Sequence, residues 1–149
     1  MTNPEGVLPE TVPFNIPYGQ PISSERAQSV IEAAIGEATK RGWPINVAVV
    51  DSGGNLVAFR RMDTAQTTST NAVRKARVAV QYRRPTRFFD TELRRGVIYI
   101  LTLEGIIAGP GGVPLTDSNG WIIGGVGCSG GTGDQDEVIA NAGASALNR

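Results

Sequence analysis

Histidine is absent from this sequence of 149 residues. Histidine is the side chain that most often serves as a general base near neutral pH, and it is also the commonest metal ligand. Its absence excludes a Ser-His-Asp triad, a Cys-His pair and any metal site built on imidazole. Any chemistry that the protein performs is therefore done without that group.

Cysteine and long apolar runs are also scarce. The sequence has one cysteine, Cys128, so no disulfide forms within the chain. Residues 1–23 lack the charged start and apolar centre of a signal peptide, and no run of about 18 apolar residues occurs. We therefore expect a cytoplasmic protein that has no membrane partner.

The charged residues balance at 14 basic and 14 acidic, so no net charge draws the protein to nucleic acid. The basic residues are nevertheless concentrated between residues 74 and 95. This concentration is typical of a solvated helix face with ion pairs to a neighbouring subunit, or of a site for an anionic ligand. The residues concerned are Arg74, Lys75, Arg77, Arg83, Arg84, Arg87, Arg94 and Arg95.

Residues 125–130, Gly-Val-Gly-Cys-Ser-Gly, fit the spacing G-x-G-x-x-G of a dinucleotide-binding loop. Such a fingerprint requires a crossover helix, a second parallel strand and an acidic residue about 20 positions later, and the sequence after Gly130 has no room for them. The acidic residues at 134, 136 and 137 would also repel a phosphate from the start of the following helix. We therefore interpret the stretch as a strand that turns tightly into a final helix.

The apolar pattern predicts an α+β fold with an antiparallel sheet flanked by helices. Prolines and aromatic residues in 1–20 indicate an extended N-terminal arm, and residues 21–149 are expected to form one domain. Apolar residues recur at helical spacing over 24–41, between Ser23 or Ser24 as the N-cap and a stop at Gly42.

The remaining elements follow from turn residues and periodicity. A hairpin is predicted over 45–61 and another over 113–128, each around a turn rich in Gly, Asn and Asp. Helices are predicted over about 65–82, 86–95 and 134–147, with Thr86 as a cap. Residues 96–111 are ambiguous because they are apolar and flanked by glycines.

Four stretches in order carry a resemblance to a known family: VAVVDSGGNLVAFRRMD, KARVAVQYRRPT, GGVPL and IIGGVGCSGGTGDQDEVIANAGASAL. Together they resemble the GlcG/HbpS family, which includes the C-terminal domain of PduO-type corrinoid adenosyltransferases, over residues 16–148. The resemblance implies a profilin-like fold, oligomers and the binding of haem or related tetrapyrroles. We expect an even-numbered homo-oligomer, because the arm cannot bury Phe14 and Tyr18 within itself.

The cofactor is not identified by the resemblance. Haem is a candidate, but a chain without histidine cannot hold iron as a histidine-ligated relative does. Cys128 and Met62 are the remaining soft ligands, and Tyr18, Tyr82 and Tyr99 are chemically available. Cys128 at the end of a strand is also typical of a small buried residue, and Met62 of a packing residue.

Arg60, Arg61 and Lys75 are the predicted ligand-binding residues. The two arginines end a strand and Lys75 lies on the helix behind it, where polar groups can converge on a pocket. Guanidinium groups suit carboxylates, and lysine acts as a point charge. The alternative is that one arginine faces solvent and the other pairs with Asp63 or Asp51.

Two functions therefore stay open. The first is a small-ligand-binding protein for haem, another tetrapyrrole or another apolar anion. The second is a small enzyme, cofactor-free or metal-assisted, that acts on a carboxylate substrate. In the second case Glu104, which lies among aliphatic residues, or Asp136 would move the proton.

Overall fold

The structure is a computed structural model that describes residue 6 and residues 8–148. It confirms the predicted α+β fold with an antiparallel sheet. The elements in chain order are α1 (Ser24–Arg41), β1 (Asn46–Asp51), β2 (Leu56–Arg61), α2 (Ser69–Gln81), α3 (Arg87–Arg94), η1 (Ile98–Thr102), β3 (Gly112–Thr116), β4 (Ile122–Ser129), α4 (Gly133–Ser145) and η2 (Ala146–Asn148). Part of the predicted arm, residues 1–5 and 7, lies outside the described residues.

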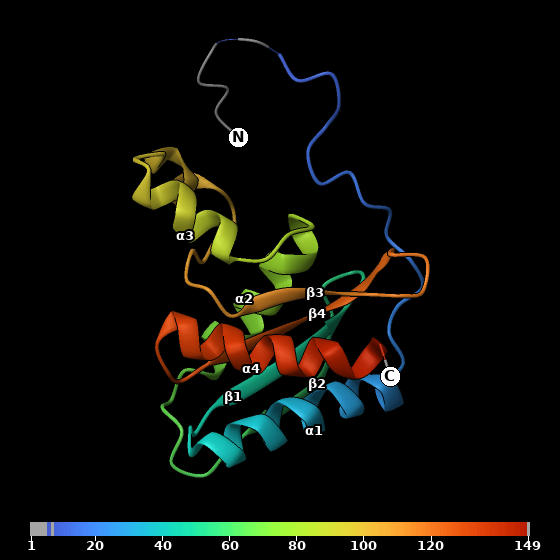
Figure 1. Cartoon of the computed structure of the whole chain (residues 1–149), viewed down its shortest axis with the longest axis vertical. Coiled ribbons are helices and arrows are strands. Elements are labelled where there is room, and N and C mark those ends of the chain that lie inside the picture. The colour runs from blue at the N-terminus through green and yellow to red at the C-terminus, as the bar shows by residue number, and fades with distance from the viewer. Residues whose placement is uncertain (1–5, 7, 149) are drawn as a thin grey trace.

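The sheet has the strand order β2-β1-β4-β3, and every neighbouring pair is antiparallel. The two predicted hairpins are β1-β2 and β3-β4, and they join through β1 and β4 in the middle of the sheet. Helices α1 and α4 lie side by side on one face, and α2 covers the other face (Figure 1). No helix among the described residues is long and apolar enough to cross a membrane.

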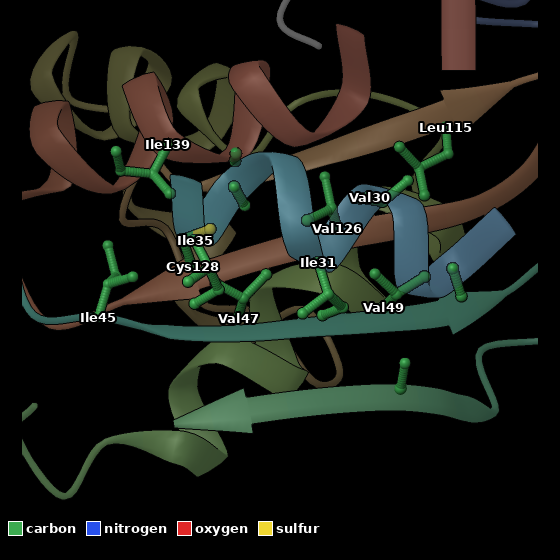
Figure 2. Close-up of a cluster of buried hydrophobic side chains, with 14 of the residues drawn as sticks. Val30, Ile31, Ile35, Ile45, Val47, Val49, Leu115, Val126, Cys128 and Ile139 are labelled. Atoms are coloured by element: carbon green, nitrogen blue, oxygen red, sulfur yellow. The ribbon is translucent and has the colours of Figure 1, made fainter. Parts of the chain in front are cut away.

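The main core lies between the sheet and the pair α1 and α4 (Figure 2). Helix α1 forms as predicted: the Ser23 side chain accepts the N–H of Arg26, and Gly42 ends the helix in the left-handed conformation. Its apolar face buries Val30, Ile31 and Ile35 against the central strands. Removal of this apolar surface from water is the main favourable contribution to folding.

On the opposite face, α2 approaches the sheet so closely that only glycine fits beneath it. A Cβ atom at Gly127 would lie 2.0 Å from the carbonyl oxygen of Ala72, and one at Gly112 would lie 2.2 Å from that of Lys75. The residues that resemble a dinucleotide loop are thus a buried strand on which a helix packs.

Two local features differ from the predictions, and one ambiguous segment is resolved. Helix α2 begins at Ser69 and not near residue 65, after a turn that follows Met62. Thr86 precedes α3 but makes no side-chain cap, because its hydroxyl bonds to Gly109 and Gly112. The ambiguous segment 96–111 contains η1 and folds with α3 around a separate small core of Val78, Phe89 and Ile100.

We expect Gly127→Ala to destabilise the fold strongly, because the added methyl group would collide with the backbone of α2. Gly36→Ala is the matched control, since Gly36 lies within α1 with nothing within 4 Å of its Cβ position. That exchange should stabilise the protein by about 0.5–1 kcal/mol. Urea unfolding of both variants tests the packing, and a wild-type midpoint for Gly127→Ala would contradict it.

Candidate functional site

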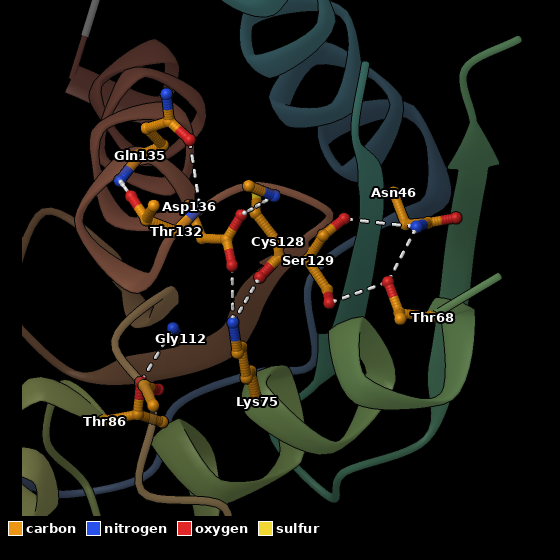
Figure 3. Close-up of polar contacts among 12 residues, drawn as sticks. Asn46, Thr68, Lys75, Thr86, Gly112, Cys128, Ser129, Thr132, Gln135 and Asp136 are labelled. Carbon is orange, nitrogen blue, oxygen red and sulfur yellow. Dashed lines mark hydrogen bonds and ion pairs between the residues drawn. The ribbon is translucent and has the colours of Figure 1, made fainter. Parts of the chain in front are cut away.

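Lys75 and Asp136 form a buried ion pair beneath α2. The Lys75 Nζ donates to Asp136 Oδ2 at 2.8 Å and to the carbonyl oxygen of Cys128 at 3.0 Å (Figure 3). The N–H of Gly131 donates to the other carboxylate oxygen, Oδ1, at 2.9 Å. Only 5% of Lys75 and 2% of Asp136 is exposed. The pair connects α2, the end of β4 and the first turn of α4.

Burial sets the protonation of the groups around this pair. It raises the pKa of Asp136, and the Lys75 ammonium and the Gly131 N–H oppose that rise. It also raises the pKa of the Cys128 thiol well above its usual range. Cys128 is completely buried, so it presents no thiolate to a ligand.

A second polar group ties the start of β1 to the end of β4 (Figure 3). The Asn46 amide nitrogen donates to the carbonyl oxygen of Ser129 at 3.1 Å and to that of Gln66 at 3.0 Å. The Ser129 hydroxyl donates to the Thr68 hydroxyl at 2.9 Å. The sequence signal for this network is an asparagine within the otherwise apolar stretch INVAVV.

Arg60 and Arg61 lie with Met62 at the end of β2, in a cleft of about 380 Å³ against α1. Ile35 and Thr39 form the wall on the α1 side. Both arginines are exposed, and Met62 is half-buried. The cleft is therefore lined by two basic residues, one acidic residue (Asp63), a thioether and one aliphatic side chain (Ile35).

Neither arginine makes an ion pair within the described part of the chain. Arg61 Nη2 donates to the carbonyl oxygen of Ala65 at 2.6 Å. Asp63 lines the same cleft without pairing with either guanidinium, and Asp51 accepts backbone bonds in its own hairpin turn. The alternative of pairing with Asp51 or Asp63 is thus not what the structure shows.

The other candidate residues are dispersed. Lys75 does not line this cleft: its ammonium is held by Asp136 and Cys128. Glu104 is exposed on the loop after η1, far along the chain from the buried Asp136. The Tyr82 hydroxyl donates to the carbonyl oxygen of Glu104, whereas Tyr18 and Tyr99 are exposed.

Comparison of the sequence and of the fold with known proteins identifies the same family of proteins. The family model described as "Haem degrading protein HbpS-like" matches residues 22–145. The chain therefore belongs to the HbpS-like family. It is 38% identical to the Protein GlcG of Escherichia coli K12 over 109 residues, which are 72% of this chain and 81% of that protein.

Two solved structures have the same fold. A crystal structure of HbpS has a TM-score of 0.80 and 32% identity, covering 93% of this chain and 99% of the other. The crystal structure of the PduOC complex with haem has a TM-score of 0.76 and 28% identity, covering 86% of this chain and 96% of the other.

We predict that Lys75→Met and Asp136→Asn each destabilise the protein by about 3–5 kcal/mol, because each change leaves a buried polar partner without its counter-charge. The double variant should recover most of this loss, since the asparagine keeps an acceptor for the Gly131 N–H. Arg94→Met is the control, because it breaks only the exposed pair with Asp90 and should cost under about 1 kcal/mol. Urea unfolding of the four variants measures the interaction energy between Lys75 and Asp136. A loss in the double variant equal to the sum of the two single losses would refute this interaction.

Proposed function

We propose that this protein binds a small apolar anion of the tetrapyrrole class, in the cleft formed by Arg60, Arg61 and Met62. The observation that carries the proposal is that Arg60 and Arg61 both line one cleft at the end of β2 and make no ion pair among the described residues. Arginine binds carboxylates through two parallel hydrogen bonds, so the pair suits a ligand with two carboxylate groups.

The composition of the cleft fits such a ligand. The propionates of a tetrapyrrole would lie on Arg60 and Arg61, and Met62 with Ile35 would contact its apolar body. For a haem, Met62 is the side chain in this cleft with a recognised iron-ligating atom, and the bound group would supply the redox chemistry of its iron. Cys128 does not fit that role, because it is buried and its pKa is raised.

The relatives support the ligand class. The PduOC structure is a complex with haem, and the family model that matches this chain is described by haem degradation. This chain has no histidine, so binding through the carboxylates of the ligand matters more here than binding through iron.

We expect Arg60→Ala and Arg61→Ala each to weaken the binding of metal-free protoporphyrin by about 2–5 kcal/mol, because each change leaves a ligand carboxylate without its cation. Titration followed by absorbance or fluorescence measures the affinity. The matched control is Arg94→Ala, which removes an exposed arginine from α3.

The same titration with haem separates recognition of the ring from ligation of the iron. Met62→Leu should leave protoporphyrin affinity unchanged and alter the haem absorption spectrum. Wild-type protoporphyrin affinity in the double variant of Arg60 and Arg61 would move the site elsewhere. No binding of either compound by the wild-type protein would reject the ligand class.

We also propose that the protein forms an even-numbered homo-oligomer. Large apolar side chains are exposed on the edge strand β2, on η1 and beside the second hairpin turn, and they include Leu56, Phe59, Ile98, Tyr99, Leu101 and Trp121. Exposed apolar patches are typical of protein interfaces. Light scattering at micromolar concentration should give an even multiple of 15.7 kDa, and a monomer mass would contradict the proposal.

A further inference from the structure

Arg84, which follows α2, is buried among aromatic rings. Only 8% of the residue is exposed. Its guanidinium carbon lies 4.1 Å from the ring centroid of Phe14, 4.8 Å from that of Phe88 and 5.9 Å from that of Phe89. Its Nε donates to the carbonyl oxygen of Tyr82 at 2.7 Å.

This cation has no counter-charge in the described part of the chain. Arg84 makes no ion pair there, and its buried Nη1 has no hydrogen-bond acceptor. Burial lowers the pKa of Arg84, and the neighbouring charge of Arg83 lowers it further. Attraction to the aromatic faces offsets part of the cost of burying a charge. A carboxylate at Nη1 would offset much more, because unpaired buried charges are the costly ones.

The ring that covers Arg84 on one side comes from the N-terminal arm and not from the domain core. Phe14 has a φ of 55°, in the left-handed region where a bulky residue is strained. Phe14 is 37% exposed, and its ring meets that of Phe88 edge to face with the centroids 5.3 Å apart.

The arm is attached to the end of α2 at its other residues. Arg83 Nη1 donates to the carbonyl oxygen of Ile16 at 3.2 Å, and the Tyr18 hydroxyl donates to that of Val80 at 2.7 Å. Movement of Phe14 alone would therefore open one side of Arg84 while the rest of the arm keeps its anchors.

We propose that Arg84 and Phe88 form a binding site for a small aryl-alkanoic acid, whose ring takes the place that Phe14 occupies in this structure. The ligand ring would stack on the guanidinium, and its carboxylate would accept the hydrogen bond that Nη1 lacks. The two groups must be joined by a short flexible link, because a ring above the guanidinium face and a carboxylate in the guanidinium plane cannot belong to one flat molecule. The single negative charge of such an acid would lie at the Nη1 atom of Arg84, which has no acceptor among the described residues.

This site is separate from the cleft at the end of β2. Arg60 and Arg61 lie shortly before α2 in the chain, and Arg84 lies just after it. A helix of 13 residues spans about 20 Å. The aryl-alkanoic acid site therefore does not depend on the proposed tetrapyrrole cleft, and the two sites respond to different variants.

The experiment is a calorimetric titration of the full chain with 3-phenylpropionate, with benzoate and butyrate as comparison ligands. We expect 3-phenylpropionate to bind at least about ten-fold more tightly than either, because it alone satisfies both the stacking and the hydrogen bond. Phe14→Ala should tighten its binding by about ten-fold, since the competing ring is removed. Arg84→Gln should abolish binding, whereas Arg94→Gln and the variants at Arg60 and Arg61 should not change it.

Chymotrypsin cleavage after Phe14 gives a second readout that a purely structural role of Arg84 would not produce. Saturating 3-phenylpropionate should accelerate this cleavage several-fold in the wild-type protein, because the ligand displaces the ring. The rate is divided by that of a reference peptide in the same mixture, since the ligand also occupies the aromatic pocket of the protease. If Arg84→Gln does not fold, Arg84→Lys replaces it in the titration, because lysine keeps the charge but lacks the Nη1 atom. The affinity of Phe14→Ala for 3-phenylpropionate then still tests the proposal. Equal affinity of Phe14→Ala and wild type, or ligand binding without faster cleavage, would overturn the proposal.

Discussion

The close contact between α2 and the sheet determines how the rest of the molecule is built. Glycines in β3 and β4 leave room for the helix backbone to lie directly on the strands. The helix positions that face the sheet are consequently enclosed, whatever residue they carry. Lys75 is one of them, and it is buried because the backbone around it is buried. A buried ammonium requires a counter-charge, and the first turn of α4 supplies it through Asp136.

The same contact leaves β2 open. Helix α2 packs over β1, β4 and β3, and α1 reaches β2 only along part of its other face. The edge strand therefore keeps its last residues at the surface, with Arg60 and Arg61 outside any ion pair in the described part of the chain. A sheet covered asymmetrically in this way has a stable centre and one edge that is free for recognition. The packing under α2 and the exposed arginines thus lie on different strands.

The fold was predictable from the sequence because its signals are local. The apolar spacing of α1 lies within the helix and its caps directly flank it, and the turns of both hairpins have characteristic residues. A cation on the helix behind a strand end suits an anionic ligand, and Lys75 is predicted to bind one on that ground, whereas the structure pairs it with Asp136. The contrary signal was present, since Lys75 shares a helix stripe with Ala72, Ala76 and Ala79, all of which are buried. The partner of Lys75 lies 61 residues away along the chain, a separation that no local pattern conveys.

The burial of Arg84 was equally inaccessible to local reasoning. Phe14 lies 70 positions before it, on a segment whose proline content indicated only an extended arm. The hydrogen bonds of the Thr86 hydroxyl were also not predictable from local patterns, because Gly109 and Gly112 lie in or beside a segment with no clear periodicity. Sequence patterns identify helices and strands well, whereas contacts between irregular segments depend on the tertiary fold of the whole chain.

Because Cys128 is buried, chemical labelling of its thiol measures how often the core opens. Its thiol is enclosed in the main core, and burial keeps it protonated, so alkylating reagents meet neither an accessible sulfur nor a thiolate while the core is closed. Every modification event therefore reports that β4 has separated from the helices that cover it. Since the chain has no other cysteine, the rate of labelling at this single atom measures the opening of the core without any engineered probe.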